Sequence, residues 1–202
     1  MTRMGPIVRR GGCVLGSRSS PSAPTAVAGR KPTAAANRPP VRSVMIDRRA
    51  LADIADHGFD GLESVFALFG VTHPDGAVQV MFAADVSAER TRETSSVQVS
   101  FARLAGWNKR IAGIRDCELI GDLHIHPRDH GTVANPSRAD LKWWRSQLAR
   151  SSRPFWIGAV AQRPYDADAA WLTPTVTTFV IWKDDAGRTD CCVLDAELEP
   201  RR

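Results

Sequence analysis

The sequence places two histidines, His124 and His126, one residue apart on a segment rich in apolar residues. Successive side chains of a β-strand point to opposite faces, so both imidazoles share one face and can converge on a single ion. Leu123 and Ile125 then face the other way, into a core. Pro127 has no backbone N–H, and we expect it to close the strand directly after the second histidine.

One loop later, Ser137 and Asp140 lie three residues apart, at the start of a stretch with helical spacing of apolar residues. Residues three apart share one face of a helix, so an Asp140 oxygen can join the nitrogens of His124 and His126. Three protein ligands with an open fourth position are the arrangement of a catalytic zinc, whereas structural zinc sites are closed by four. The pattern therefore predicts a catalytic metal site.

Each of these features also has a simpler structural explanation. Ser137 could serve only as a helix N-cap and Asp140 only as its capping-box partner, and a His-x-His pair can be two ordinary strand residues. Asp122, which should share a strand face with His124, and His130 could be further ligands or partners of ligands, although such residues are more often merely solvated. The conjunction of the histidine pair with Ser-x-x-Asp is more specific than either part and favours the metal site.

Hydrolysis at a metal needs a base and a hydrogen-bond donor for the charge that develops on the carbonyl oxygen. Glu63 is the candidate base, because it opens an apolar run over residues 63–70 that should end beside the metal. It could equally be an exposed residue at a strand end. Ser137 could be the donor if its hydroxyl turns toward the metal instead of capping the helix.

Taken together, these residues resemble the JAMM motif of the JAB/MPN metalloprotease family. The elements follow in the family's order: Glu63 with Gly70 seven residues on, then His-Ile-His-Pro over residues 124–127 and Ser-Arg-Ala-Asp over residues 137–140. The similarity spans about residues 46 to 195. Two positions depart from the family pattern, since Ile125 stands where many members have Ser and Ala67 replaces a frequent Gly. Neither departure removes a ligand, and they indicate a divergent bacterial branch.

The resemblance implies a role for each residue of the motif. His124, His126 and Asp140 would bind Zn²⁺, Glu63 would act as the acid and base on water, and Ser137 would donate to the oxyanion. It also implies a cytidine-deaminase-like α/β/α sandwich for residues 46–202.

The resemblance implies zinc-dependent cleavage of an amide or isopeptide bond at the C-terminal tail of a ubiquitin-like protein, in deconjugation or maturation. Relatives of this type accompany ubiquitin-like conjugation systems, antiphage ones included, so the partners would be the modifier, its conjugates and the activating and conjugating enzymes. Processing of a sulfur-carrier protein by the same chemistry is an alternative. A non-catalytic MPN-type scaffold is a second alternative, disfavoured because no ligand is missing.

The spacing of apolar residues predicts a mixed sheet flanked by helices, an α/β architecture. We expect a helix over residues 45–57 ended by Gly58, and helices over 101–114 and 137–150. The expected strands are 63–70, 77–83, 95–99, 117–126, 155–161, 175–182 and 189–194. Turns should join the strands over 63–70 and 77–83, and those over 175–182 and 189–194, into hairpins.

Charge is distributed unevenly along the chain. Residues 1–46 carry eight Arg or Lys and no Asp or Glu, so with a net charge of +5 for the whole chain the remainder carries −3. The basic pI thus belongs to residues 1–45, a Pro-, Ala-, Ser- and Arg-rich tail that we expect to be disordered. We favour a solvated extension or a misplaced start, with Met45 as an alternative start, over an organelle transit peptide.

Composition also limits where the protein works and what it binds. The chain outside the tail carries a net negative charge, which makes a basic nucleic-acid-binding domain unlikely, although loose attraction through the tail remains an alternative. No apolar run is long enough to span a membrane, and the first residues lack the apolar core of a secretory signal. We therefore expect a cytoplasmic protein.

Overall fold

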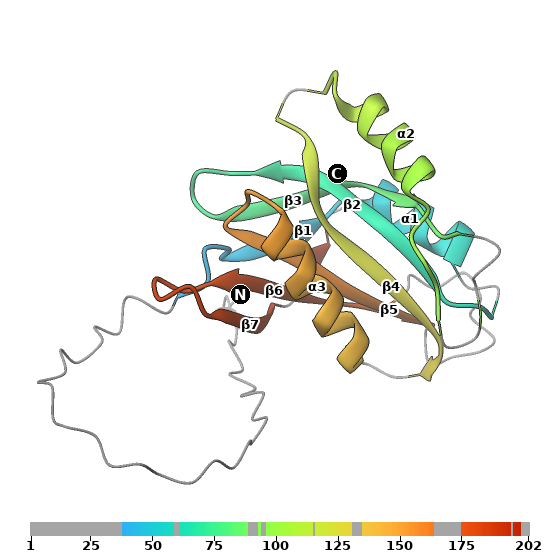
Figure 1. Ribbon diagram of the computed structural model, residues 1–202. Helices are drawn as coiled ribbons and strands as arrows, with labels where there is room; N and C mark the ends of the chain where they lie inside the picture. Colours follow the sequence, from blue (N-terminus) through green and yellow to red (C-terminus); the bar gives the residue numbers. More distant parts are fainter. Residues whose placement is uncertain are drawn as a thin grey trace, which may run out of the picture.

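An eight-stranded sheet forms the framework of the part of the chain that the structure describes (Figure 1). This computed structural model describes residues 38–58, 61–88, 93, 96–114, 116–130, 135–163, 175–194 and 196–198. In their order across the sheet, the strands are β7 (Thr189–Leu194), β6 (Thr175–Lys183), β5 (Phe155–Arg163), β4 (Glu118–His130), β2 (Ser64–Thr72), β3 (Ala77–Asp85), β1 (Ser43–Ile46) and β8 (Ala196–Leu198). The helices of these ranges are α1 (Arg48–Gly58), α2 (Phe101–Ile111) and α3 (Arg138–Arg150).

Parallel and antiparallel neighbours are mixed in this sheet. Strand β2 runs antiparallel to β3 and β4, and β6 runs antiparallel to β5 and β7. The pair β4 and β5 is parallel, as are the two pairs that β1 makes with β3 and β8. Both predicted hairpins are confirmed, because β2 pairs with β3 and β6 pairs with β7. The expected α/β architecture, a mixed sheet with helices, is the one observed.

The two faces of the sheet are covered by different helices (Figure 1). On one face, α1 packs against the largest apolar cluster, which takes buried side chains from β1 to β6. On the other face, α3 lies over β5 and β6, with Trp144 and Leu148 buried beneath it. Helix α2 covers β2 on this second face through Leu104, Trp107 and Ile111. The second face between α2 and α3 is where the predicted site residues of β4 lie.

The boundary expected between tail and domain was wrong, because the folded part begins before residue 46. Residues 43–46 form β1, and Val41 and Val44 are buried in the largest apolar cluster. The backbone N–H of Arg42 donates to the Gly76 carbonyl at 2.8 Å. A four-residue strand in an Arg-rich context has no recognisable period, and it is held by pairing with distant β3 and β8. The earlier part of the predicted tail, residues 1–37, lies outside the described residues.

Three local expectations also need correction. The first helix begins at Arg48 and not at residue 45, because the preceding residues belong to β1. Strand β4 does not stop at Pro127 but continues to His130, after an irregularity in its pairing with β5 where a residue without an N–H can be accommodated. Of the strand predicted over 95–99, the described residues form only an isolated bridge between Val99 and Ser87.

None of the helices in the described ranges is long and apolar enough to cross a membrane.

Candidate metal centre

Strand β4 presents the two predicted histidines on one face. Leu123 and Ile125, on either side of His124, are fully buried in the cluster under α1. His124 and His126 point the opposite way, with side chains 13% and 12% exposed. The alternation predicted from the sequence is therefore confirmed, and both imidazoles lie at the face that α3 covers.

Asp140 brings a carboxylate to this pair from the first turn of α3. Its Oδ1 lies 2.9 Å from Nδ1 of His124, and its Oδ2 lies 3.3 Å from Nε2 of His126. The predicted proximity of the three side chains is thus confirmed. They come from two elements joined by the loop after β4, and each imidazole faces a different oxygen of the same carboxylate.

A capping box fixes the position of the Asp140 carboxylate. The backbone N–H of Ser137 donates to Asp140 Oδ2 at 2.7 Å, and the backbone N–H of Asp140 donates to Ser137 Oγ at 3.2 Å. The capping role and the role beside the histidines, which the sequence left as alternatives, occur together. Ser137 is exposed and accepts through a lone pair, so its O–H proton remains available for donation.

Glu63 directly precedes β2, at the end of the pairing between β2 and β4. Val65 pairs with His124 and Ser64 with Ile125, so this antiparallel register, continued by one residue, would set Glu63 opposite His126. Directly opposite residues of paired strands project from the same face. Glu63 is half-buried, and its backbone N–H donates to the Glu93 carbonyl at 2.8 Å. The last residue of β4, His130, has a side chain outside the described part.

Charges within the group determine its protonation. Burial disfavours the imidazolium of His124, but the neighbouring carboxylates of Asp122 and Asp140 outweigh this effect and raise its pKa to about 10. Burial favours the neutral form of Asp140, but hydrogen bonds from His124, His126 and the Ser137 backbone lower its pKa well below the usual range. Asp140 is therefore ionised at neutral pH, and a metal ion bound at His124 would displace a proton.

The residues fit Zn²⁺ in type, although they do not form a ready coordination shell. Two imidazoles and a carboxylate are common zinc ligands. Within the described ranges, however, no group of three or more His, Cys, Asp or Glu side chains is arranged to hold a metal ion. The imidazoles face the oxygens of Asp140 and not a common centre, so metal binding requires these side chains to open slightly.

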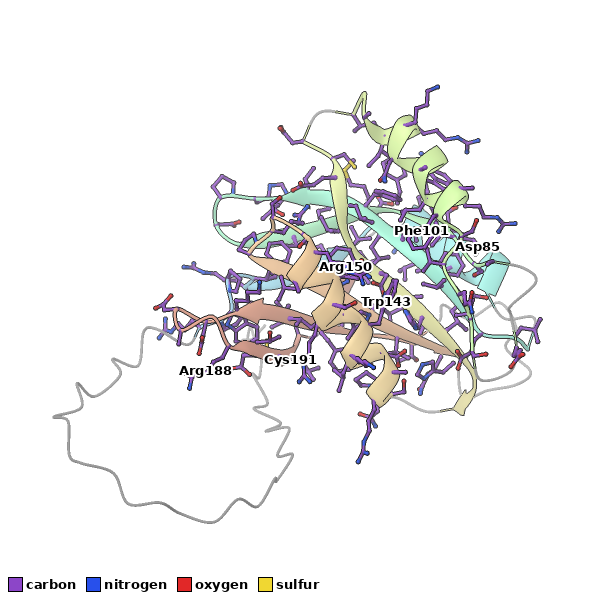
Figure 2. The ribbon with its side chains drawn as sticks, in the orientation of Figure 1. Asp85, Phe101, Trp143, Arg150, Arg188 and Cys191 are labelled. Carbon is purple, nitrogen blue, oxygen red and sulfur yellow. The ribbon has the colours of Figure 1, made fainter. Side chains whose placement is uncertain are left out.

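Asp122 is, with His130, one of two functional candidates that the sequence left unresolved. It lies on the His124 face of β4, is 6% exposed, and has its Oδ1 3.1 Å from His124 Nε2. Trp143 extends from α3 (Figure 2), and its indole N–H donates to Asp122 Oδ2 at 3.1 Å. Two further tryptophans, Trp144 and Trp156, also donate to it. Strand alternation predicted that Asp122 shares a face with His124. The three indole donors become evident only from the packing of α3 on β5.

Comparison with known proteins supports the fold alone. No family model matches the chain, and no curated protein does. The solution structure of protein DSY2949 from Desulfitobacterium hafniense is similar, with a TM-score of 0.52 and 16% sequence identity. The similarity covers 78% of this chain and 94% of that one. At this identity the two chains share an arrangement of strands and helices, and no activity follows from it.

Proposed function

We propose that the chain is a zinc-dependent peptidase or isopeptidase of the JAB/MPN type that cleaves at the C-terminal tail of a ubiquitin-like protein. The observation that carries the proposal is the convergence of His124 Nδ1 and His126 Nε2 on the two oxygens of an ionised Asp140. The JAMM-like order of Glu63, the histidine pair and Ser-x-x-Asp points to the same chemistry. The proposal includes a cytidine-deaminase-like sandwich as the fold and the cytoplasm as the location.

His124, His126 and Asp140 would hold the ion. When bound, Zn²⁺ supplies a Lewis acid that polarises a carbonyl group and makes a water molecule a better nucleophile. Glu63 accepts the proton of the attacking water and delivers it to the departing amine, so oxygen ends on the acyl carbon and hydrogen on the amine nitrogen. The Ser137 hydroxyl donates to the negative charge that develops on the carbonyl oxygen.

An extended substrate tail could lie along the last part of β4. The described pairing of β2 with β4 ends at Ser64 and Ile125, whereas β4 continues to His130. A tail in β-conformation can add to such a strand through its backbone groups, with pockets for alternate side chains giving specificity. A glycine-rich tail suits this position because it brings the scissile amide close to the histidines without large side chains in between.

Metal content and cleavage test the proposal in the full chain. We expect the wild type to hold about one Zn²⁺ per chain, measured by elemental mass spectrometry, and to cleave fusions of ubiquitin-like proteins that end in a glycine-rich tail. Glu63→Gln should keep the metal and lose cleavage, because the amide does not accept the proton of water. His126→Ala should lose the metal and cleavage together.

Matched substitutions away from the site serve as controls. His73→Ala, in the exposed turn after β2, should keep the metal, and Glu118→Gln, whose carboxylate pairs with Arg153 at 2.8 Å, should keep both metal and cleavage. Cleavage by Glu63→Gln at the wild-type rate would reject Glu63 as the base. A wild-type chain that binds no zinc, or an unchanged zinc content in His126→Ala, would reject the ligand set.

A further inference from the structure

Asp122 is a buried carboxylate that accepts hydrogen bonds from three indole N–H groups. Trp144 Nε1 donates to Oδ1 at 2.7 Å, and Trp156 Nε1 and Trp143 Nε1 donate to Oδ2 at 2.9 and 3.1 Å. His124 Nε2 lies 3.1 Å from Oδ1 as a fourth N–H neighbour. A carboxylate offers about four lone-pair positions, and three of these take indole N–H groups from α3 and β5.

A glycine on β5 makes room for this arrangement. Gly158 pairs with Asp122 in the register between β5 and β4, and a Cβ added there would lie 2.3 to 2.5 Å from ring atoms of Trp144. The missing side chain lets the Trp144 indole lie against the sheet, where its N–H reaches Asp122. The Trp144 indole also stacks on Phe179, with ring centroids 5.6 Å apart.

Accepting hydrogen bonds from three indole N–H groups does not by itself require a charged side chain at position 122. A buried carboxylate is costly to desolvate, and neutral acceptors can take hydrogen bonds from indole N–H groups. What the negative charge adds is its effect on His124, whose ring lies between two carboxylates, with Nδ1 toward Asp140 and Nε2 toward Asp122. Nε2 is buried and has no regular hydrogen-bond partner among the described residues, so Asp122 acts on it as a charge 3.1 Å away.

We propose that Asp122 is a positioning residue that determines which nitrogen of His124 keeps its proton and which one binds the metal. A carboxylate 3.1 Å from Nε2 favours the N–H at that nitrogen, so the proton that a metal ion displaces is the one on Nδ1, 2.9 Å from the ligand Asp140. A carboxylate behind a metal-binding histidine orients the ring and increases its basicity. The three indoles keep the carboxylate in place. This inference rests on the proposed metal site and adds a residue to it.

The first test compares Zn²⁺ affinity in variants of the full chain, by competition with a chromogenic chelator. Asp122→Asn should weaken affinity roughly 10- to 100-fold, the loss typical for such partners of metal-binding histidines. Trp156→Phe is the matched control, because it removes a donor to Oδ2 and leaves Oδ1 beside His124. Trp144→Phe removes the donor to Oδ1 itself, and its Zn²⁺ affinity should lie between those of Asp122→Asn and Trp156→Phe. If Asp122→Asn does not fold, the comparison of Trp144→Phe with Trp156→Phe still tests the inference.

A second readout separates positioning from a merely structural role. In the Co²⁺-loaded wild type, the buried Nε2–H of His124 should give a shifted imidazole proton signal in NMR spectra that exchanges slowly with solvent. We expect fast exchange or loss of this signal in Asp122→Asn and its retention in Trp156→Phe. Unfolding free energies from urea titrations of all variants show how far each change affects the fold.

The outcomes distinguish the inference from the proposed function. If the wild type binds Zn²⁺ but affinity falls only in proportion to stability, equally in Asp122→Asn, Trp144→Phe and Trp156→Phe, Asp122 has a structural role and the inference is overturned. A slowly exchanging proton that survives in Asp122→Asn would overturn it as well. A wild type that binds neither Zn²⁺ nor Co²⁺ would overturn the proposed function, and the inference with it.

Discussion

At the scale of the residue, Ser137 and Asp140 each serve the backbone and the candidate centre together. Asp140 accepts from the Ser137 N–H with the same Oδ2 that faces His126, and Ser137 caps α3 with the hydroxyl that could donate to substrate. A capping box holds both side chains in one geometry, so the centre is partly preorganised by the start of the helix. A substitution here therefore affects stability and chemistry through one contact.

We predict that Ser137→Ala loses stability and activity, whereas a matched cap substitution loses only stability. Removing an N-cap hydroxyl costs about 1 kcal/mol, which urea unfolding measures. Ser100 is the control because it caps α2 by accepting from the Arg103 N–H at 3.4 Å, away from the histidines. Ser100→Ala should be destabilised and keep cleavage, and Ser137→Thr should keep both properties. Equal cleavage rates in Ser100→Ala and Ser137→Ala would show that Ser137 caps α3 and takes no part in cleavage.

At the scale of the element, β4 depends on a close approach to its neighbour β5. Gly121 lies three residues before His124 and pairs with Ile157, and a Cβ added at Gly121 would lie 1.9 Å from the Ile157 carbonyl oxygen. The backbone of β5 has to move to accept any side chain there. The same two strands carry Asp122 and Gly158, so their spacing sets the position of the histidine pair relative to α3.

Gly121→Ala should accordingly lower the free energy of unfolding by about 1 to 3 kcal/mol, the usual cost of overpacking a tight site. Gly106→Ala is a control of the same chemical change in α2, where a Cβ would meet nothing within 4 Å. Because alanine favours helices over glycine by up to about 1 kcal/mol, Gly106→Ala should be neutral or stabilised. Urea unfolding of both variants checks this, and a Gly121→Ala as stable as the wild type would contradict it.

At the scale of the molecule, the first strand closes the sheet between distant parts of the chain. Strand β1 pairs with β3 on one side and with β8, close to the end of the chain, on the other. Val41 and Val44 then contribute to the cluster that α1 and the central strands share. The domain therefore needs residues that composition alone assigns to the basic tail.

Two truncations test this boundary. A chain that begins at Met45 should be less stable than one that begins at Val41, because it lacks the buried Val41 and Val44 and the pairing of Ser43 and Val44 with β3. Burial of each valine contributes roughly 1.5 to 3 kcal/mol, a large share of the stability of an ordinary domain. Urea unfolding of the two chains measures the difference. Equal stability would show that β1 contributes little to the fold.

The sequence by itself determined the elements whose pattern is local. Alternation placed His124 and His126 on one face with Leu123 and Ile125 in the core, and turn residues between apolar runs predicted both hairpins. The capping signal placed the start of α3 at Ser137. Periods of two and 3.6 residues depend on neighbours in the chain, so a single sequence carries them. The metal itself, and the reaction, stay predictions.

Only the tertiary structure decided what depends on pairing and packing between distant segments. Strand β1 is too short to show a period, and its place in the sheet comes from hydrogen bonds to β3 and β8. The three indoles around Asp122 come from α3 and β5, and Gly158 is needed only because Trp144 lies on it. These contacts join residues from 14 apart, Trp144 and Gly158, to 152 apart, Val44 and Ala196. No local period encodes which side chains then meet.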